Sequence, residues 1–120
     1  MILNAFGLVL GLFAASAASA EEVAAGRVAE LRALDRISGA LSDLFVPVGE
    51  SVKLGPMAVT VVECRYPVEN PSGDAYAYLL IDDLRGQTKL FEGWMVASSP
   101  ALNPFDHMRY DIWVLRCSNS

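Results

Sequence analysis

The chain has 120 residues, with nine Lys and Arg against fourteen Asp and Glu, and its formal net charge is −5 at pH 7. This acidic balance argues against a nucleic-acid partner, because such partners select basic surfaces. Once the apolar first twenty residues are set apart, the remainder is long enough for one domain with a modest core, and too short for two.

Residues 1–20 form an apolar run that closes with the small residues Ala18-Ser19-Ala20. This pattern predicts a secretory signal peptide that is cleaved after Ala20. A membrane anchor is the alternative, but a span needs about 20 apolar residues, and this run is shorter and ends in small side chains. We therefore expect an exported protein whose mature chain has no transmembrane segment.

The mature chain begins with residues 21–27, which we interpret as a flexible lead-in, followed by a single β domain over residues 28–120. Residues 28–37 fit two structures. Leu31 and Leu34 lie on a helical stripe, whereas Ala29, Leu31 and Ala33 alternate with polar residues as in a strand. The residues alone leave this choice open.

The rest of the chain is a series of short segments rich in Val, Ile and aromatic residues, separated by turn residues. A Gly55-Pro56 turn predicts a hairpin, and the prolines and polar residues of 65–74 predict a surface loop without regular pairing. The predicted strands cover residues 40–48, 51–54, 57–64, 75–81, 89–97 and 110–117. This pattern predicts an all-β fold, a small antiparallel sandwich or partly closed barrel.

Aromatic residues on two neighbouring predicted strands have two interpretations. Alternation places Tyr76 and Tyr78 on one face of their strand, and Trp94 lies on the following strand opposite Gly93. The three rings either belong to the core or form a platform for a sugar or a peptide. Gly93 itself indicates a bulge or a close approach of another part of the chain.

The only two cysteines are Cys64 and Cys117, each at the end of a strand-like segment. An even number of cysteines in an exported chain predicts one structural disulfide. Free buried thiols are the alternative, and a redox or zinc site lacks the necessary C-x-x-C spacing and further ligands. Strict alternation along the last strand places Cys117 on the face of Trp113.

The long segment 98–110 holds the candidates for chemistry. A hydrolase using Ser99 and His107 is a remote possibility, because no nucleophile elbow is present and Ser99-Pro100 resembles a helix cap. Neither Asp106, His107 and Asp111 nor Asp74, Asp82 and Asp83 has the ligand spacing of a metal site. We expect no catalytic residue, no metal and no cofactor.

Three stretches carry a resemblance to a known family. They are Ala33-Leu-Asp-Arg-Ile-Ser-Gly39, Cys64-Arg-Tyr-Pro-Val-Glu-Asn-Pro-Ser-Gly-Asp-Ala-Tyr-Ala-Tyr78, and Gly93-Trp-Met-Val-Ala-Ser-Ser-Pro-Ala-Leu-Asn103 with Tyr110-Asp-Ile-Trp-Val-Leu-Arg-Cys117. They resemble the domain-of-unknown-function family 2155 of Gram-negative bacteria, for which no activity is established. The resemblance implies an exported, periplasmic protein associated with the cell envelope. It also favours a strand over residues 28–37.

These observations lead to an expected function. We expect a non-catalytic periplasmic module that binds an envelope protein or a cell-wall polymer through the 98–110 loop, since long ordered loops in small domains often carry function. A small-ligand-binding β-barrel is the alternative. The candidate partner-binding residues of the loop are Leu102, Asn103, Phe105, Asp106, His107 and Arg109.

Overall fold

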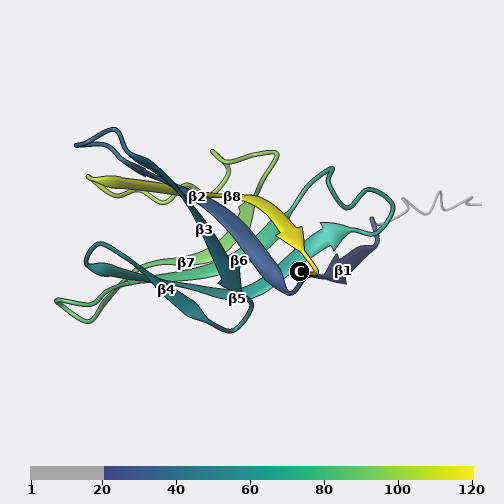
Figure 1. Ribbon diagram of the computed structural model, residues 1–120, viewed down its shortest axis with the longest axis horizontal. Helices are drawn as coiled ribbons and strands as arrows, with labels where there is room; N and C mark the ends of the chain where they lie inside the picture. Colours follow the sequence, from purple (N-terminus) through teal and green to yellow (C-terminus); the bar gives the residue numbers. More distant parts are fainter. Residues whose placement is uncertain (1–20) are drawn as a thin grey trace, which may run out of the picture.

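A computed structural model describes residues 21–120, which contain eight β-strands and no helix (Figure 1). The predicted signal peptide, residues 1–20, lies outside the described residues. No helix in residues 21–120 is long and apolar enough to cross a membrane. The strands are β1 (Val23–Ala25), β2 (Val28–Asp35), β3 (Leu41–Pro47), β4 (Ser51–Leu54), β5 (Met57–Pro67), β6 (Tyr76–Asp83), β7 (Thr88–Val96) and β8 (Tyr110–Ser118).

The strands form two antiparallel sheets, which confirms the predicted all-β fold. In the larger sheet the order is β1-β5-β6-β7, and β4 also pairs with β5. The smaller sheet has the order β3-β2-β8 and packs across the larger one (Figure 1). The two sheets of the described chain do not close into a barrel.

The core lies between the sheets and follows the alternation of each strand. In β6, Ala77, Leu79 and Ile81 are fully buried, whereas the intervening side chains are partly exposed on the outer face. Pairing with both β5 and β7 makes β6 a central strand. In β2, Ala29 and Leu31 face the core, so the structure resolves residues 28–35 as a strand and not a helix.

Two predictions about irregular segments are corrected. Val23–Ala25, inside the expected flexible lead-in, forms a strand that pairs with Arg65–Pro67 at the end of β5. Consequently residues 65–67 are paired, although the sequence predicted a loop there. Pro67 is tolerated because it is the last residue of β5. Its missing N–H therefore does not break a run of hydrogen bonds that continues beyond it.

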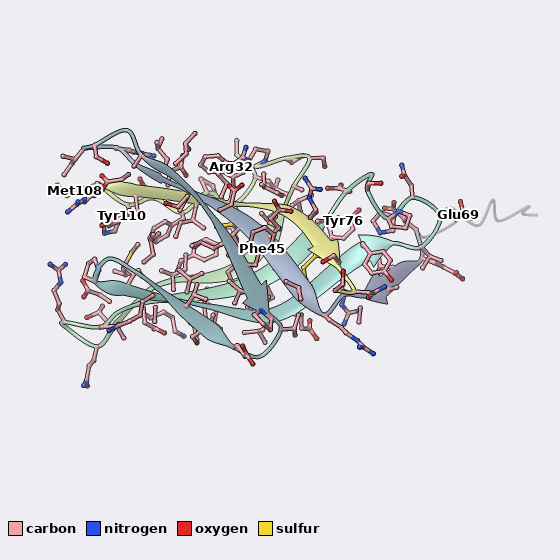
Figure 2. All side chains as sticks on the ribbon, in the orientation of Figure 1. Arg32, Phe45, Glu69, Tyr76, Met108 and Tyr110 are labelled. Carbon is pink, nitrogen blue, oxygen red and sulfur yellow. A yellow bond between two sulfur atoms is a disulfide. The ribbon has the colours of Figure 1, made fainter. Side chains whose placement is uncertain are left out.

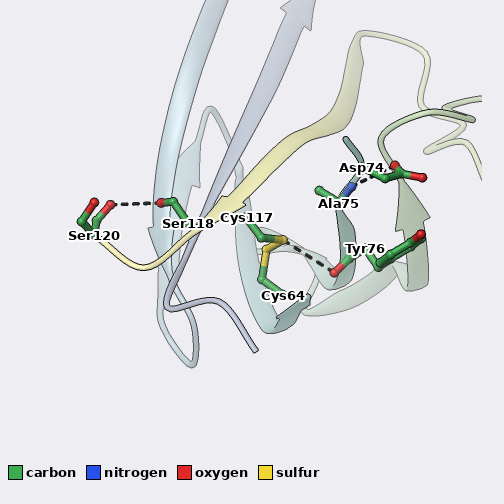
Figure 3. Close-up of a disulfide and its surroundings, with 7 residues drawn as sticks. All are labelled: Cys64, Asp74, Ala75, Tyr76, Cys117, Ser118 and Ser120. Atoms are coloured by element: carbon green, nitrogen blue, oxygen red, sulfur yellow. Dashed lines mark hydrogen bonds between the residues drawn. A yellow bond between two sulfur atoms is a disulfide. The ribbon is translucent and has the colours of Figure 1, made fainter. Parts of the chain in front are cut away.

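The disulfide Cys64–Cys117 joins β5 of one sheet to β8 of the other, as predicted (Figure 3). Its Cα atoms are 5.7 Å apart, within the usual range for a disulfide. Both sulfur-bearing side chains are buried between the sheets. The bond therefore ties the two layers together near one end of the sandwich.

Two β-bulges turn the cysteines inward. The pairing of β5 with β6 skips Val62, and the pairing of β8 with β2 skips Leu115. Each extra residue reverses the alternation of the residues that follow it. Cys117 therefore lies on the buried face with Val114 and not on the face of Trp113, which corrects the prediction from strict alternation.

Candidate functional site

The loop between β7 and β8, residues 97–109, is anchored at its start by Asp74. The carboxylate of Asp74 accepts hydrogen bonds from the N–H of Ser98 at 3.0 Å, from the hydroxyl of Ser98 at 2.7 Å and from the N–H of Ala75 at 2.8 Å. Partial burial raises the pKa of Asp74, but these hydrogen bonds outweigh that effect, and the pKa lies below its ordinary value. An ionised Asp74 thus binds the start of the loop to the segment that enters β6.

A turn and an amide bridge hold the middle of the loop. The N–H of Leu102 donates to the carbonyl oxygen of Ser99 at 3.0 Å, and this turn does not continue into the helix that Ser99-Pro100 suggested. The side-chain Nδ2 of Asn103 then donates to the backbone oxygen of Trp94 at 3.1 Å. A Cβ atom at Gly93 would lie 2.6 Å from this Nδ2, so the glycine admits the close approach that the sequence indicated.

Aromatic packing fixes the second half of the loop. Phe105 is buried in the core, where its ring meets Phe91 edge-on at a centroid distance of 6.2 Å. The imidazole of His107 stacks on Phe105 with a centroid distance of 5.4 Å and an interplanar angle of 12°. The loop therefore contributes to the core and cannot swing away as a unit without exposing Phe105.

The ring of His107 also organises the backbone that enters β8. Its Nδ1 accepts hydrogen bonds from the N–H of Arg109 at 3.0 Å and from the N–H of Tyr110 at 3.1 Å. This arrangement requires the tautomer with its proton on Nε2. A serine hydrolase instead needs Nε2 without a proton, to act as the base, and a proton on Nδ1 that binds a carboxylate, which is the opposite arrangement.

An ion pair closes the loop against the β2–β3 turn. The Nη2 of Arg109 lies 3.0 Å from Asp35 Oδ2, and its Nε lies 3.3 Å from both carboxylate oxygens. The hydrogen bond from Arg109, supported by the N–H groups of Ile37 and Ser38, lowers the pKa of Asp35 to about 2. The N–H of Arg36 also donates to the Arg109 carbonyl oxygen at 2.8 Å, so side chain and backbone join the same two segments.

The six candidate residues therefore divide into two groups. Asn103, Phe105, His107 and Arg109 hold the loop in place, whereas Leu102 and Asp106 project from it. Leu102 is 73% exposed. Sequence reasoning missed Met108, which is 94% exposed at the end of the loop (Figure 2).

A groove of about 500 Å³ lies between this loop and β8. Its floor is mostly apolar, and charged side chains of both signs stand at its edge. We call it the loop groove. It is lined by Arg36, Pro100, Ala101, Pro104, Phe105, Asp106, Asp111, Ile112 and Trp113.

The groove runs beside an unpaired strand edge. In the described chain β8 pairs only with β2. Since Arg36 bonds to Arg109, alternation along the ladder directs the backbone groups of Tyr110 and Ile112 away from β2. The outward N–H of Tyr110 donates to His107, while Ile112, whose side chain is buried, is the next residue with outward backbone groups and also lines the groove.

The predicted aromatic residues form a second surface, on the outer face of the larger sheet. Tyr78 pairs with Trp94, a residue that is 39% exposed, and the two rings meet edge-on at a centroid distance of 5.4 Å. The Tyr76 hydroxyl donates to Glu21, which raises the pKa of Tyr76 to about 12. These rings are not in the core. A shallow hollow of about 420 Å³ beside them is lined by Glu21, Val23, Arg65, Tyr76, Trp94 and Val96.

Within residues 21–120, no group of three or more His, Cys, Asp or Glu side chains is placed to hold a metal ion. Acidic residues of the two sets considered as metal ligands instead contact other side chains of the chain. Asp74 binds Ser98, Asp83 binds Arg85 and Asp111 lies 3.7 Å from Arg36. The lining of the loop groove offers a partner apolar contact, backbone hydrogen bonding and charged side chains of both signs.

Comparison with known proteins gives two similarities. Residues 29–117 match the model of DUF2155, a family described as an uncharacterised protein conserved in bacteria. An uncharacterised protein of Rickettsia prowazekii (strain Madrid E), RP359, is 28% identical over 88 residues, which cover 71% of this chain and 57% of that protein. The chain thus spans little more than half the length of this relative. No solved structure matches at a significant level.

Proposed function

Because the chain belongs to the DUF2155 family, whose description names no activity, we propose its function from its surface. The protein is a non-catalytic, periplasmic module of the cell envelope that binds a protein partner in the loop groove. The signal-like sequence of residues 1–20 supports export. The disulfide Cys64–Cys117 supports an oxidising compartment.

One observation carries the proposal, namely the apolar groove beside the free edge of β8. An extended peptide adds a strand to such an edge through main-chain hydrogen bonds, and neighbouring pockets select its side chains. Ile112 offers its backbone to the incoming strand, and Pro100 and Pro104 form the opposite wall. The proline rings have no N–H of their own to satisfy, so this wall suits apolar side chains.

The chemistry of the groove defines the kind of segment it takes. The partly exposed Trp113 gives the groove an aromatic side chain, which favours a large apolar side chain of the partner. Arg36 and Asp106 stand at the edge with opposite charges. The partner segment is therefore extended, apolar at alternate positions and able to pair with either charge at its ends.

A substitution that fills the groove tests this function. Ala101→Trp places a large ring in the groove, and we expect it to abolish recovery of the protein partner from an envelope extract while the melting temperature stays unchanged. Val68→Trp, at an exposed position of another loop, is the matched control and should leave recovery intact. Equal recovery by both stable variants would reject the groove as the binding site.

A small ligand on the outer aromatic face is a second candidate, favoured by the exposure of Trp94 beside the shallow hollow. Flat rings with Arg65 and Glu21 at the margin suit a sugar ring, which stacks on an aromatic face and offers hydroxyls to charged groups. Native mass spectrometry of the exported protein should then retain a small molecule that Trp94→Ala releases and Trp113→Ala keeps. Protein free of any small molecule would count against this candidate.

A further inference from the structure

The strand β3 forms the other edge of the smaller sheet, and its outer backbone groups are free for pairing. No strand of residues 21–120 lies hydrogen-bonded to this side of β3. The N–H of Asp35 donates to the carbonyl oxygen of Ala40, which fixes the alternation of the β2–β3 ladder. Leu41, Asp43 and Phe45 therefore direct their backbone N–H and C=O groups outward.

The same three residues place their side chains on one exposed face. Leu41 is 62% exposed and Phe45 is 63% exposed, high values for large apolar side chains in a strand. Figure 2 labels Phe45 on β3. They stand two positions on either side of Asp43, whose carboxylate binds Arg32 Nε at 2.8 Å. Edge strands are usually protected by lysine, proline or a bulge, and between Leu41 and Val46 this strand has none of them.

We propose that two copies of this protein pair through β3, antiparallel, across a twofold axis at Asp43. In this register Leu41 of one copy faces Phe45 of the other, and both residues direct their backbone groups toward the partner. The spacing is therefore self-complementary in side chains and in hydrogen bonds, as a twofold interface requires. The smaller sheets of the two copies become one continuous sheet.

The charges at the twofold axis limit the stability of this dimer. The two Asp43 carboxylates face each other, and like charges directly opposite destabilise a strand pair. Each is balanced within its own chain by Arg32, and this ion pair lowers the pKa of Asp43. The contact is small, so the dimer is weak and reversible, and salt that screens the carboxylates strengthens it.

Cysteine cross-linking tests the register. Residues that face each other in a hydrogen-bonded antiparallel pair have Cα atoms about 5.5 Å apart, a distance that a disulfide can span. Asp43→Cys should therefore give a covalent dimer under mild oxidation. Phe45→Cys is the control, because the two copies of position 45 would lie roughly 13 Å apart and should stay uncoupled.

Sedimentation measurements over a range of protein concentrations test the contact itself. We expect Phe45→Lys to raise the dimer dissociation constant about tenfold or more, whereas Val62→Lys, on the outer face of the other sheet, should leave it unchanged. A protein that stays monomeric at all concentrations, or a dimer indifferent to Phe45→Lys, would overturn the proposal. Cross-linking at position 45 but not at 43 would do the same. The loop groove lies at the opposite edge, so this outcome is independent of partner binding.

Discussion

At the scale of single residues, polar side chains hold the loop rather than extend it toward solvent. Asp74, Asn103, His107 and Arg109 each bind backbone or an opposite charge within the chain. A loop with so many internal bonds keeps one shape before a partner arrives. Less conformational entropy is then lost on binding, which favours affinity.

The ion pair of Asp35 with Arg109 gives the loop an acid-sensitive anchor. The pKa of Asp35 lies below its unfolded value of 3.8, at about 2, so its stabilisation is complete above the unfolded value and is lost as the pH falls toward 2. Asp35→Asn should lower stability at neutral pH and flatten the acid dependence across this window. Urea unfolding of both proteins at several pH values measures the difference. Parallel pH profiles for the two proteins would contradict this role of Asp35.

The contact between Gly93 and Asn103 predicts a coupling between two distant positions. Gly93→Ala adds a Cβ atom against Asn103 Nδ2, so the amide must leave the Trp94 oxygen and the loop should loosen. The cost should be on the order of 1 kcal/mol, and it should shrink when Asn103→Ala is already present. The measurement is a double-mutant cycle, which compares the unfolding free energies of the native protein, the two single variants and the double variant. Additive effects would show that Gly93 is required for another reason.

At the scale of elements, the bulges decide which side chains meet. Without the extra residues Val62 and Leu115, Cys64 and Cys117 would each lie on the outer face of its own sheet. Removing Leu115 should therefore turn Cys117 outward and leave both thiols free. Alkylation of the deletion variant without reductant, with circular dichroism to verify strand content, measures this outcome. A folded deletion variant that still forms the disulfide would contradict it.

Much of the element pattern could be predicted from the sequence, because alternation and turn residues are local signals. The hairpin at Gly55-Pro56 and the two-faced β6 follow directly from them. The bulges could not be predicted, since an extra residue in a strand costs little locally and is chosen by the pairing of distant strands. Strand β1 was missed for the same reason, because three residues acquire their structure only by pairing with β5.

The same limit applies to the candidate site. Its location in the 98–110 segment could be predicted from the unusual length of the loop between two strands. The sequence could not predict which loop residues face inward. Phe105 is positioned by Phe91, and His107 is positioned by the backbone that enters β8. The contribution of Ile112 depends on the direction of its backbone groups, and no local pattern encodes that direction.

At the scale of the whole molecule, one disulfide joins the two sheets in addition to the chain connections and the shared core. The disulfide joins residues separated by 53 positions, and closing a loop of that length stabilises the fold by about 4 kcal/mol in the chain-entropy model. Cys117→Ser should cost about 2–5 kcal/mol, measured by thermal or denaturant unfolding. Reduction of the native protein should cost a similar amount. An unchanged melting temperature would mean that packing alone joins the layers.

The two edges of the smaller sheet give the molecule two different surfaces. The edge at β8 carries the loop groove, and the edge at β3 carries Leu41 and Phe45. A partner segment on one edge and a second copy on the other would not compete for residues. Together the two proposals describe a paired scaffold that offers one groove on each copy.

Photo-cross-linking from the loop groove in living cells tests the central claim most directly. A benzophenone amino acid at position 101 should form an adduct with one envelope protein, and the same group at position 68 should form none. Irradiation followed by mass spectrometry of the adducts would identify the partner and the segment that lies beside β8. The absence of any adduct from position 101, or the same adducts from both positions, would contradict recognition through the groove.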